Sequence, residues 1–193
     1  MRNILIGTGL MVLIGLPAQA DFARDLANAA EDRTRHNVRY DPSYVSIPYP
    51  MGDVPANTGV CTDVVIRSLR ALGIDLQQLV HEDMKRNFRK YPKIWGLRRP
   101  DPNIDHRRVP NLETYMTRRG FALPVTSDAT AFRPGDIVTW RLADNRPHMG
   151  IVTSQKSPDG VPLIAHNIGW GPRIEDMLFD LKIHRHFRWT GEN

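Results

Sequence analysis

The chain has 193 residues, of which 41% are hydrophobic and 24% are charged, with a formal net charge of +5 at pH 7. This length suits one well-buried domain better than two, and the mixed charges argue against wholesale disorder. The basic residues are scattered and no nucleic-acid-binding motif accompanies them, so we expect no nucleic-acid partner. An anionic polymer or peptide carboxylates suit the charge better, and a generic basic surface explains it equally well.

The first 20 residues have the pattern of a secretory signal peptide. Arg2 supplies a positive charge, residues 4–16 are almost wholly apolar, and Ala18-Gln19-Ala20 provides small residues for cleavage. The apolar run is short for a membrane span. We therefore expect residues 1–20 to be removed, leaving a single domain of residues 21–193 without a membrane anchor. This domain is expected to be monomeric and periplasmic or secreted.

Helical patterns come first in the expected domain. Apolar spacing predicts helices at residues 21–35, from Cys61 to Gly73, at 76–90 and at 110–120. A Pro-rich stretch from Tyr40 predicts an ordered loop that leads into Cys61. The segment from Trp95 to Asn111 contains too many Pro and Arg residues for regular structure.

From Phe121 the pattern becomes typical of strands, which are predicted at residues 136–140, 148–153, 163–167 and 183–189. Short connections between successive strands indicate an antiparallel meander. Helices followed by strands predict an α+β domain, with the N-terminal helices packed on one face of an antiparallel sheet.

Cys61 is the only cysteine of the chain. An exported protein that keeps one unpaired thiol either buries it deeply or uses it. At the start of a helix, the unpaired N–H groups and the helix dipole favour the thiolate. A buried structural cysteine is the alternative.

Acyl transfer by a cysteine requires a base for the thiol and a polar group that orients the base. His148, at the start of a central strand, is the candidate base. His166, at the end of the neighbouring strand, is the candidate orienting group, and Asn167 is its rival because successive strand residues point to opposite faces. Cys61, His148 and His166 are also acceptable zinc ligands, although their spacing matches no recognised zinc signature.

Five short motifs occur in a characteristic order. They are Tyr49-Pro50-Met51-Gly52, Val60-Cys61-Thr62-Asp63, Pro134-Gly135-Asp136-Ile137-Val138, His148-Met149-Gly150-Ile151-Val152 and Ile164-Ala165-His166. Over residues 45–170 the chain thereby resembles the papain-like NlpC superfamily of bacterial cell-wall peptidases. Val60 stands where the superfamily has an aspartate, and the insertion at 95–108 is unlike the compact members. The whole chain looks like a family of exported bacterial proteins known only as a domain of unknown function.

The resemblance implies a papain-like fold in which Cys61 is the nucleophile, His148 the base, and His166 or Asn167 the orienting group, with no cofactor. Tyr49 would line the cleft and help to stabilise the oxyanion. The implied activity is that of an exported cysteine hydrolase, an amidase or endopeptidase that acts on peptidoglycan stem peptides. The alternative is a non-catalytic module on the same fold that binds peptidoglycan or peptides, with Cys61 simply buried.

The segment Asp105-His106-Arg107-Arg108 carries a bounded charge cluster. A long irregular segment inside a compact domain is usually functional or disordered, and Tyr91 and Trp95 argue against disorder. We expect the segment to border the cleft, with Arg107 or Arg108 binding a substrate carboxylate. The alternative is a surface ion-pair cluster that holds down a long loop.

Overall fold

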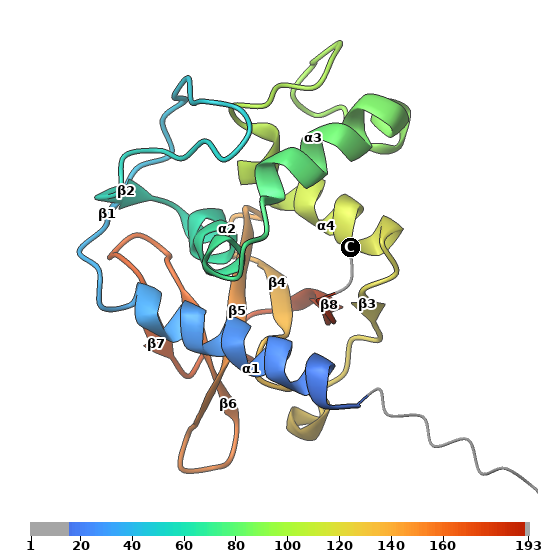
Figure 1. Ribbon diagram of the computed structural model, residues 1–193. Helices are drawn as coiled ribbons and strands as arrows, with labels where there is room; N and C mark the ends of the chain where they lie inside the picture. Colours follow the sequence, from blue (N-terminus) through green and yellow to red (C-terminus); the bar gives the residue numbers. More distant parts are fainter. Residues whose placement is uncertain (1–15, 192–193) are drawn as a thin grey trace, which may run out of the picture.

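The computed structural model describes residues 16–191 (Figure 1). Most of the expected signal peptide therefore lies outside the described residues. Residues 16–20, at its end, belong to the first helix, α1 (Leu16–Arg33). Within the described part of the chain, none of the helices has the length and apolar character that a membrane span requires.

The predicted helices are confirmed, with ends that differ by a few residues. The bounds that follow α1 are α2 (Cys61–Ala71), α3 (Leu76–Asn87) and α4 (Val109–Arg118), with short 3-10 helices η1 (Phe88–Lys90), η2 (Asp105–Arg107) and η3 (Ala129–Ala131). Asp75 caps α3, because its side chain accepts a hydrogen bond from the Gln78 N–H at 3.2 Å. Pro110 occupies the first turn of α4, where its missing N–H is no loss.

Six strands form one antiparallel sheet in the order β3-β8-β4-β5-β6-β7. The strands are β3 (Ala122–Leu123), β4 (Ile137–Arg141), β5 (Pro147–Lys156), β6 (Pro162–His166), β7 (Arg173–Glu175) and β8 (Ile183–Phe187). The predicted meander is confirmed for β4, β5 and β6, whereas β8 returns to the far side of β4. Two-residue β1 (Arg39–Tyr40) and β2 (Thr58–Gly59) pair in parallel as a separate small sheet. The sequence did not predict β1, β2, β3 or β7, because strands of two or three residues are too short to show alternation.

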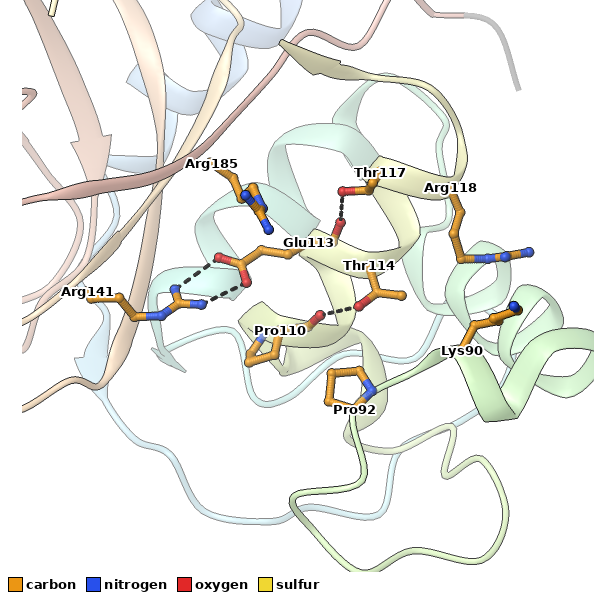
Figure 2. A pocket seen from close by; sticks show the side chains of 9 residues that line it. All are labelled: Lys90, Pro92, Pro110, Glu113, Thr114, Thr117, Arg118, Arg141 and Arg185. Carbon is orange, nitrogen blue, oxygen red and sulfur yellow. Dashed lines mark hydrogen bonds and ion pairs between the residues drawn. The ribbon is translucent and has the colours of Figure 1, made fainter. Parts of the chain in front are cut away.

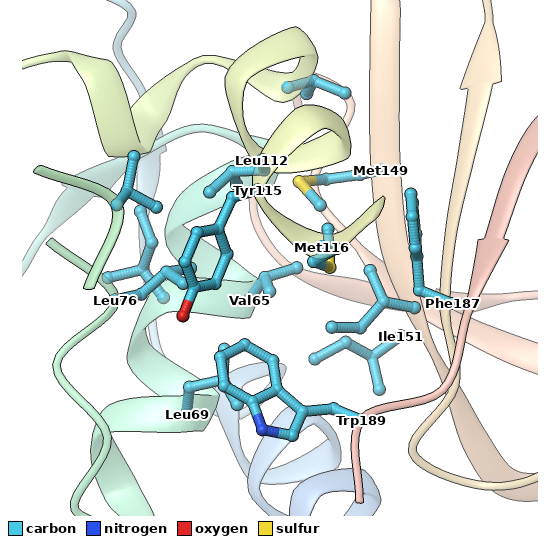
Figure 3. Packing of buried hydrophobic residues seen from close by; sticks show 14 of the residues in the cluster. Val65, Leu69, Leu76, Leu112, Tyr115, Met116, Met149, Ile151, Phe187 and Trp189 are labelled. Carbon is cyan, nitrogen blue, oxygen red and sulfur yellow. The ribbon is translucent and has the colours of Figure 1, made fainter. Parts of the chain in front are cut away.

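The helices cover one face of the sheet, as predicted, and the main core lies between them. Helices α1, α2 and α4 all contact the central strand β5. Figure 3 shows Val65 and Leu69 of α2 facing Met149, Ile151 and neighbouring core residues. A second cluster, which includes Trp140 and Leu178, covers the opposite face. The Trp140 indole N–H donates to the Leu178 carbonyl at 3.0 Å, so the buried polar atom of this large side chain is satisfied.

Gly150 and Asp136 explain two of the sequence motifs structurally. A Cβ atom on Gly150 would lie 2.6 Å from Ile164 Cγ2 and 2.9 Å from the Ala165 carbonyl, so β5 and β6 approach closely only with glycine there. The buried Asp136 carboxylate is 2.7 Å from His186 Nε2 and accepts from Arg188 at 2.7 Å. Asp136 therefore anchors β8 against β4.

Candidate active site

Cys61 begins α2, as predicted, at a point where several contacts fix the backbone. Strand β2 precedes it and pairs with Tyr40 of β1. The Val60 N–H donates to Asp63 Oδ2 at 2.6 Å, and this closes the first turn of the helix. The same Asp63 carboxylate is paired with the Arg107 guanidinium at 2.9 Å. The start of α2 is therefore held by the loop before it and by the segment that contains Arg107.

The thiol of Cys61 is only 6% exposed, and this burial raises its pKa to about 11. The nearby Asp63 charge acts in the same direction. Backbone N–H groups of Met149, Thr62 and Cys61 itself act in the opposite direction without outweighing the burial. The expectation that the helix terminus makes Cys61 a thiolate is therefore wrong for this state, because desolvation of the sulfur is the larger effect.

His148, in β5, lies one residue from the Met149 N–H that faces the sulfur. Its ring contacts His166 of β6: His148 Nε2 lies 3.0 Å from His166 Nδ1. The other nitrogen of His166, Nε2, lies 2.8 Å from Oε2 of Glu175 in β7. Three neighbouring strands thus place His148, His166 and Glu175 in one hydrogen-bonded chain.

This chain determines where the protons lie. A carboxylate only accepts hydrogen bonds, so His166 Nε2 carries the proton that it donates to Glu175. With His166 neutral, its Nδ1 is an acceptor, and His148 Nε2 must donate to it. His148 Nδ1 is then left with a free lone pair, as a proton acceptor requires. Burial, followed by the neighbouring His166, lowers the pKa of His148 to about 3, so its ring is neutral at physiological pH.

The side chain of Asn167 does not join the hydrogen-bonded chain of His166. Its side-chain amide donates to the Gly59 carbonyl at 3.4 Å, and its side-chain oxygen accepts from the Gly169 N–H at 3.1 Å. Of the two rivals, His166 is therefore the residue that contacts His148. Asn167 instead joins the end of β6 to Gly59 at the end of β2, close before Cys61 in the sequence.

A cleft of about 270 Å³ opens beside Cys61. We call it the Cys61 cleft; its walls are formed by Tyr40, Pro42, Val60, Cys61, Trp95, Ile104, Arg107, Arg108, Val109, Pro110 and Pro147. The prediction that Tyr49 lines this cleft is wrong. Tyr49 is 41% exposed and packs edge-on against His81, with 4.9 Å between the ring centroids. Tyr40, and not Tyr49, lines the cleft together with Cys61.

Tyr40 lies close enough to Cys61 for the two groups to affect each other. Burial, followed by the Cys61 charge, raises the pKa of the Tyr40 hydroxyl, which therefore stays protonated and can donate a hydrogen bond.

The glycine of the Tyr49 motif, Gly52, has a purely structural role. A Cβ atom on Gly52 would overlap the Pro48 carbonyl, so the turn requires glycine.

The cluster at 105–108 divides into buried and cleft-facing residues. Asp105 and His106 are buried and do not line the cleft, so their prediction as substrate-binding residues is wrong. Arg107 reaches the cleft wall, but its guanidinium is bound to Asp63 and to the Ser43 and Asp41 carbonyls. Arg107 is therefore a structural ion-pair residue, as in the alternative, but its pair with Asp63 is buried and not on the surface.

Arg108 is the member of this cluster that remains a candidate for binding substrate. Its guanidinium lies 4.2 Å from the centre of the Trp95 ring, and Nη1 lies 3.0 Å from Asp105. Both Arg108 and Trp95 line the Cys61 cleft. The Arg108 guanidinium, which Trp95 and Asp105 hold in place, therefore borders the Cys61 cleft.

Sequence reasoning missed three contributors to the site: Glu175, Tyr40 and Trp95. Glu175 lies in a three-residue strand after a Gly-rich turn, which gives no pattern that points to a histidine partner. Tyr40 stands at the start of the Pro-rich loop, and pairing of β1 with β2 brings it beside Cys61. Trp95 lies in an irregular segment, where the sequence indicates order but not a place in the cleft wall.

The zinc alternative is not supported by the geometry. Among residues 16–191, no three His, Cys, Asp or Glu side chains are arranged so that they could hold a metal ion.

The fold and the site together define an α+β papain-like domain, with a cysteine at the start of a core helix and paired histidines on the sheet. A crystal structure of an N-acetylmuramoyl-L-alanine amidase from Bacteroides uniformis ATCC 8492 is similar, with a TM-score of 0.54 and 13% identity over 88% of this chain and 99% of that chain. NlpC1 from Trichomonas vaginalis is also similar, with a TM-score of 0.46 and 14% identity. The match covers 87% of this chain and 44% of NlpC1, which is less than half of its length.

Residues 27–189 match the family described as Domain of unknown function (DUF1287), and the chain belongs to this family. It is also 48% identical to the Escherichia coli K12 protein described as Uncharacterized protein YijF, over 89% of this chain and 83% of that protein.

Proposed function

We propose that this protein is an exported cysteine hydrolase that cuts amide bonds in the stem peptides of peptidoglycan. The observation that carries the proposal is the chain Glu175–His166–His148, which leaves an unprotonated His148 Nδ1 next to the strand residue that contacts the Cys61 sulfur. The fold shared with an amidase, the basic charge of the chain and the signal-like residues 1–20 support the substrate class and an extracytoplasmic location.

In the proposed reaction, His148 Nδ1 accepts the proton of the Cys61 thiol as the sulfur attacks the carbonyl carbon of the amide. The Tyr40 hydroxyl and the Cys61 N–H are suited to stabilise the negative charge that develops on the carbonyl oxygen. The C–N bond then breaks, and His148 gives its proton to the departing amine. Water attacks the resulting thioester and His148 accepts the water proton. The C–S bond then breaks, His148 returns this proton to the Cys61 sulfur, and the acid product leaves.

The raised pKa of the thiol and the lowered pKa of His148 describe a neutral resting pair. In the proposed mechanism the thiolate and imidazolium form only as substrate fills the cleft, when the developing charges gain partners. Glu175 would then support the His148 imidazolium through His166, because its carboxylate holds His166 Nδ1 as an acceptor for His148 Nε2–H.

A non-catalytic binding module is the second candidate, and one observation favours it. A neutral, buried thiol is what a structural cysteine would show. On this alternative the Cys61 cleft binds a peptide without cutting it, and the histidine chain only stabilises the sheet.

Digestion of purified muropeptides, followed by mass spectrometry, tests the proposal. Wild type, Cys61→Ala and His148→Ala are compared, with Asn167→Ala as a variant of a buried neighbour outside the histidine chain. We expect new fragments with wild type and Asn167→Ala only. Muropeptide binding without cleavage by the folded wild-type protein would favour the binding module.

A further inference from the structure

A second and larger pocket lies on the side of α4 away from the main core. Its volume is about 490 Å³, and we call it the α4 pocket. Its walls are formed by Lys90, Pro92, Pro110, Glu113, Thr114, Thr117, Arg118, Arg141 and Arg185 (Figure 2). Four of these nine residues are cations and one is an anion, so the pocket has a strong positive bias.

Two of the four cations are already neutralised. Arg141 is bound to Glu113 through both carboxylate oxygens, at 3.0 and 2.9 Å. Arg118 is bound to Asp83 at 2.8 and 3.2 Å. Glu113 also accepts from Thr139 at 2.6 Å, and its Oε1 lies 3.0 Å from His184, which leaves it little capacity for another cation.

Lys90 and Arg185 form no ion pair within residues 16–191. Figure 2 shows Arg185 on the strand side, near Glu113 and Arg141, and Lys90 across the pocket near Arg118. Both side chains belong to exposed residues, so they can move without breaking an existing contact. Two cations without ion-pair partners on opposite walls of one concave pocket give it the charge that would attract an anionic group.

The α4 pocket adjoins the Cys61 cleft. Pro110 forms part of the wall of both, at the start of α4. Beyond it, Glu113, Thr114 and Thr117 continue along the same helix face into the α4 pocket. The hydroxyl groups of Thr114 and Thr117 donate to helix carbonyls, at 2.8 and 2.7 Å. Their protons are therefore not available to a ligand, and the cations are the hydrogen-bond donors that remain along this wall.

We propose that the α4 pocket binds a carboxylate of a peptide, with Lys90 and Arg185 as its ligands. Where that peptide is the substrate, it extends from the Cys61 cleft over Pro110, and the carboxylate bound in the α4 pocket is distant from the bond that is cut. This connection to catalysis rests on the function proposed above, whereas anion binding in the pocket itself is independent of it. The mixed pocket walls, with Pro92 and Pro110 beside the cations, suit a peptide better than a free inorganic ion.

Isothermal titration calorimetry with the full chain tests the proposal without using activity. The Cys61→Ala protein is titrated at low ionic strength with hexaglutamate and with hexaglutamine that is amidated at its C-terminus, so that only hexaglutamate carries carboxylates. We expect binding of hexaglutamate only, weakened at least 10-fold by the further changes Lys90→Gln and Arg185→Gln together. Raising the salt concentration should weaken this binding as well.

Lys156→Gln and Arg35→Gln together are the matched control, because they remove one lysine and one arginine that are exposed and outside the pocket. Any one of three results overturns the proposal. These are no binding of hexaglutamate, an equal loss of affinity in both double variants, or tighter binding of inorganic phosphate than of hexaglutamate. Melting temperatures near that of the parent protein show that the variants are folded. If muropeptides prove not to be substrates, the calorimetric result still stands or fails by itself.

Discussion

His166 and Glu175 are joined by a contact of 2.8 Å between Nε2 and Oε2, and this contact determines which nitrogen of each linked histidine carries a proton. The Glu175 side chain is 43% exposed, whereas that of His166 is 2% exposed. A partly solvated carboxylate thus orients two buried rings. Neither partner is adjacent to Cys61 in the sequence.

Glu175→Gln should lower kcat roughly 10-fold, because an amide oxygen stabilises an imidazolium less than a carboxylate does. His166→Ala should lower it more, by about 100-fold, since His148 then loses its orienting partner. Cleavage rates of muropeptides measure both effects. Asn167→Ala is the control, and a larger loss of kcat in that variant than in Glu175→Gln would contradict the assigned order of contacts.

The Cys61 thiol should react slowly with iodoacetamide at pH 7 in the absence of substrate. Its pKa is raised to about 11 by burial, so the thiolate fraction is small at neutral pH and grows as the pH rises. We expect the rate of alkylation to keep increasing above pH 9. A plateau that begins below pH 8 would show that the resting thiol is ionised and would contradict the neutral resting pair.

Arg107→Ala should lower the free energy of unfolding by roughly 3 to 5 kcal/mol, because it leaves the buried Asp63 carboxylate without its ion-pair partner. Arg108→Ala should cost less stability, since Arg108 lies at the cleft wall and the carboxylate of Asp105 keeps its hydrogen bond from the Asp101 N–H. Under the proposed function, Arg108→Ala should instead raise KM. Denaturant titration and cleavage kinetics of both variants separate the two roles; equal losses of stability would refute the distinction.

Gly150→Ala should destabilise the protein by roughly 2 kcal/mol or more, because the added methyl group meets Ile164 and the Ala165 carbonyl at less than 3.0 Å. Gly73→Ala is a useful comparison. Its φ of 79° strains an alanine, but no atom lies within 4 Å of the added Cβ, so a cost of about 1 kcal/mol is expected. Thermal unfolding measures both, and the reverse order would contradict the close approach of β5 and β6.

Stability should fall as the pH decreases from 6.5 to 5. His106 is buried, and burial lowers its pKa to about 4, so the unfolded chain takes up a proton in this range and the folded chain does not. Proton uptake by the unfolded state removes roughly 2 kcal/mol by pH 5 for such a histidine. His106→Gln should reduce this slope in urea titrations at several pH values. An unchanged slope would mean that His106 does not contribute.

The sequence by itself determined the longer helices and strands and the order of the candidate residues. Helical spacing after Cys61 and strand patterns around His148 and His166 are local signals, and they predicted the start of α2 and the pairing of β5 with β6 correctly. The order of helices followed by strands predicted the α+β arrangement, with the helices on one face of the sheet.

The tertiary structure decided which groups meet and how they ionise. Tyr40 replaces Tyr49 beside the thiol through the pairing of β1 and β2, and Glu175 reaches His166 through a strand too short to recognise. Arg107 is occupied by Asp63, which lies 44 residues away in the sequence. The pKa of Cys61 rises because its whole surroundings exclude water. Pairing over long sequence distances and desolvation both depend on all packed neighbours at once, and a local pattern of residues does not contain that information.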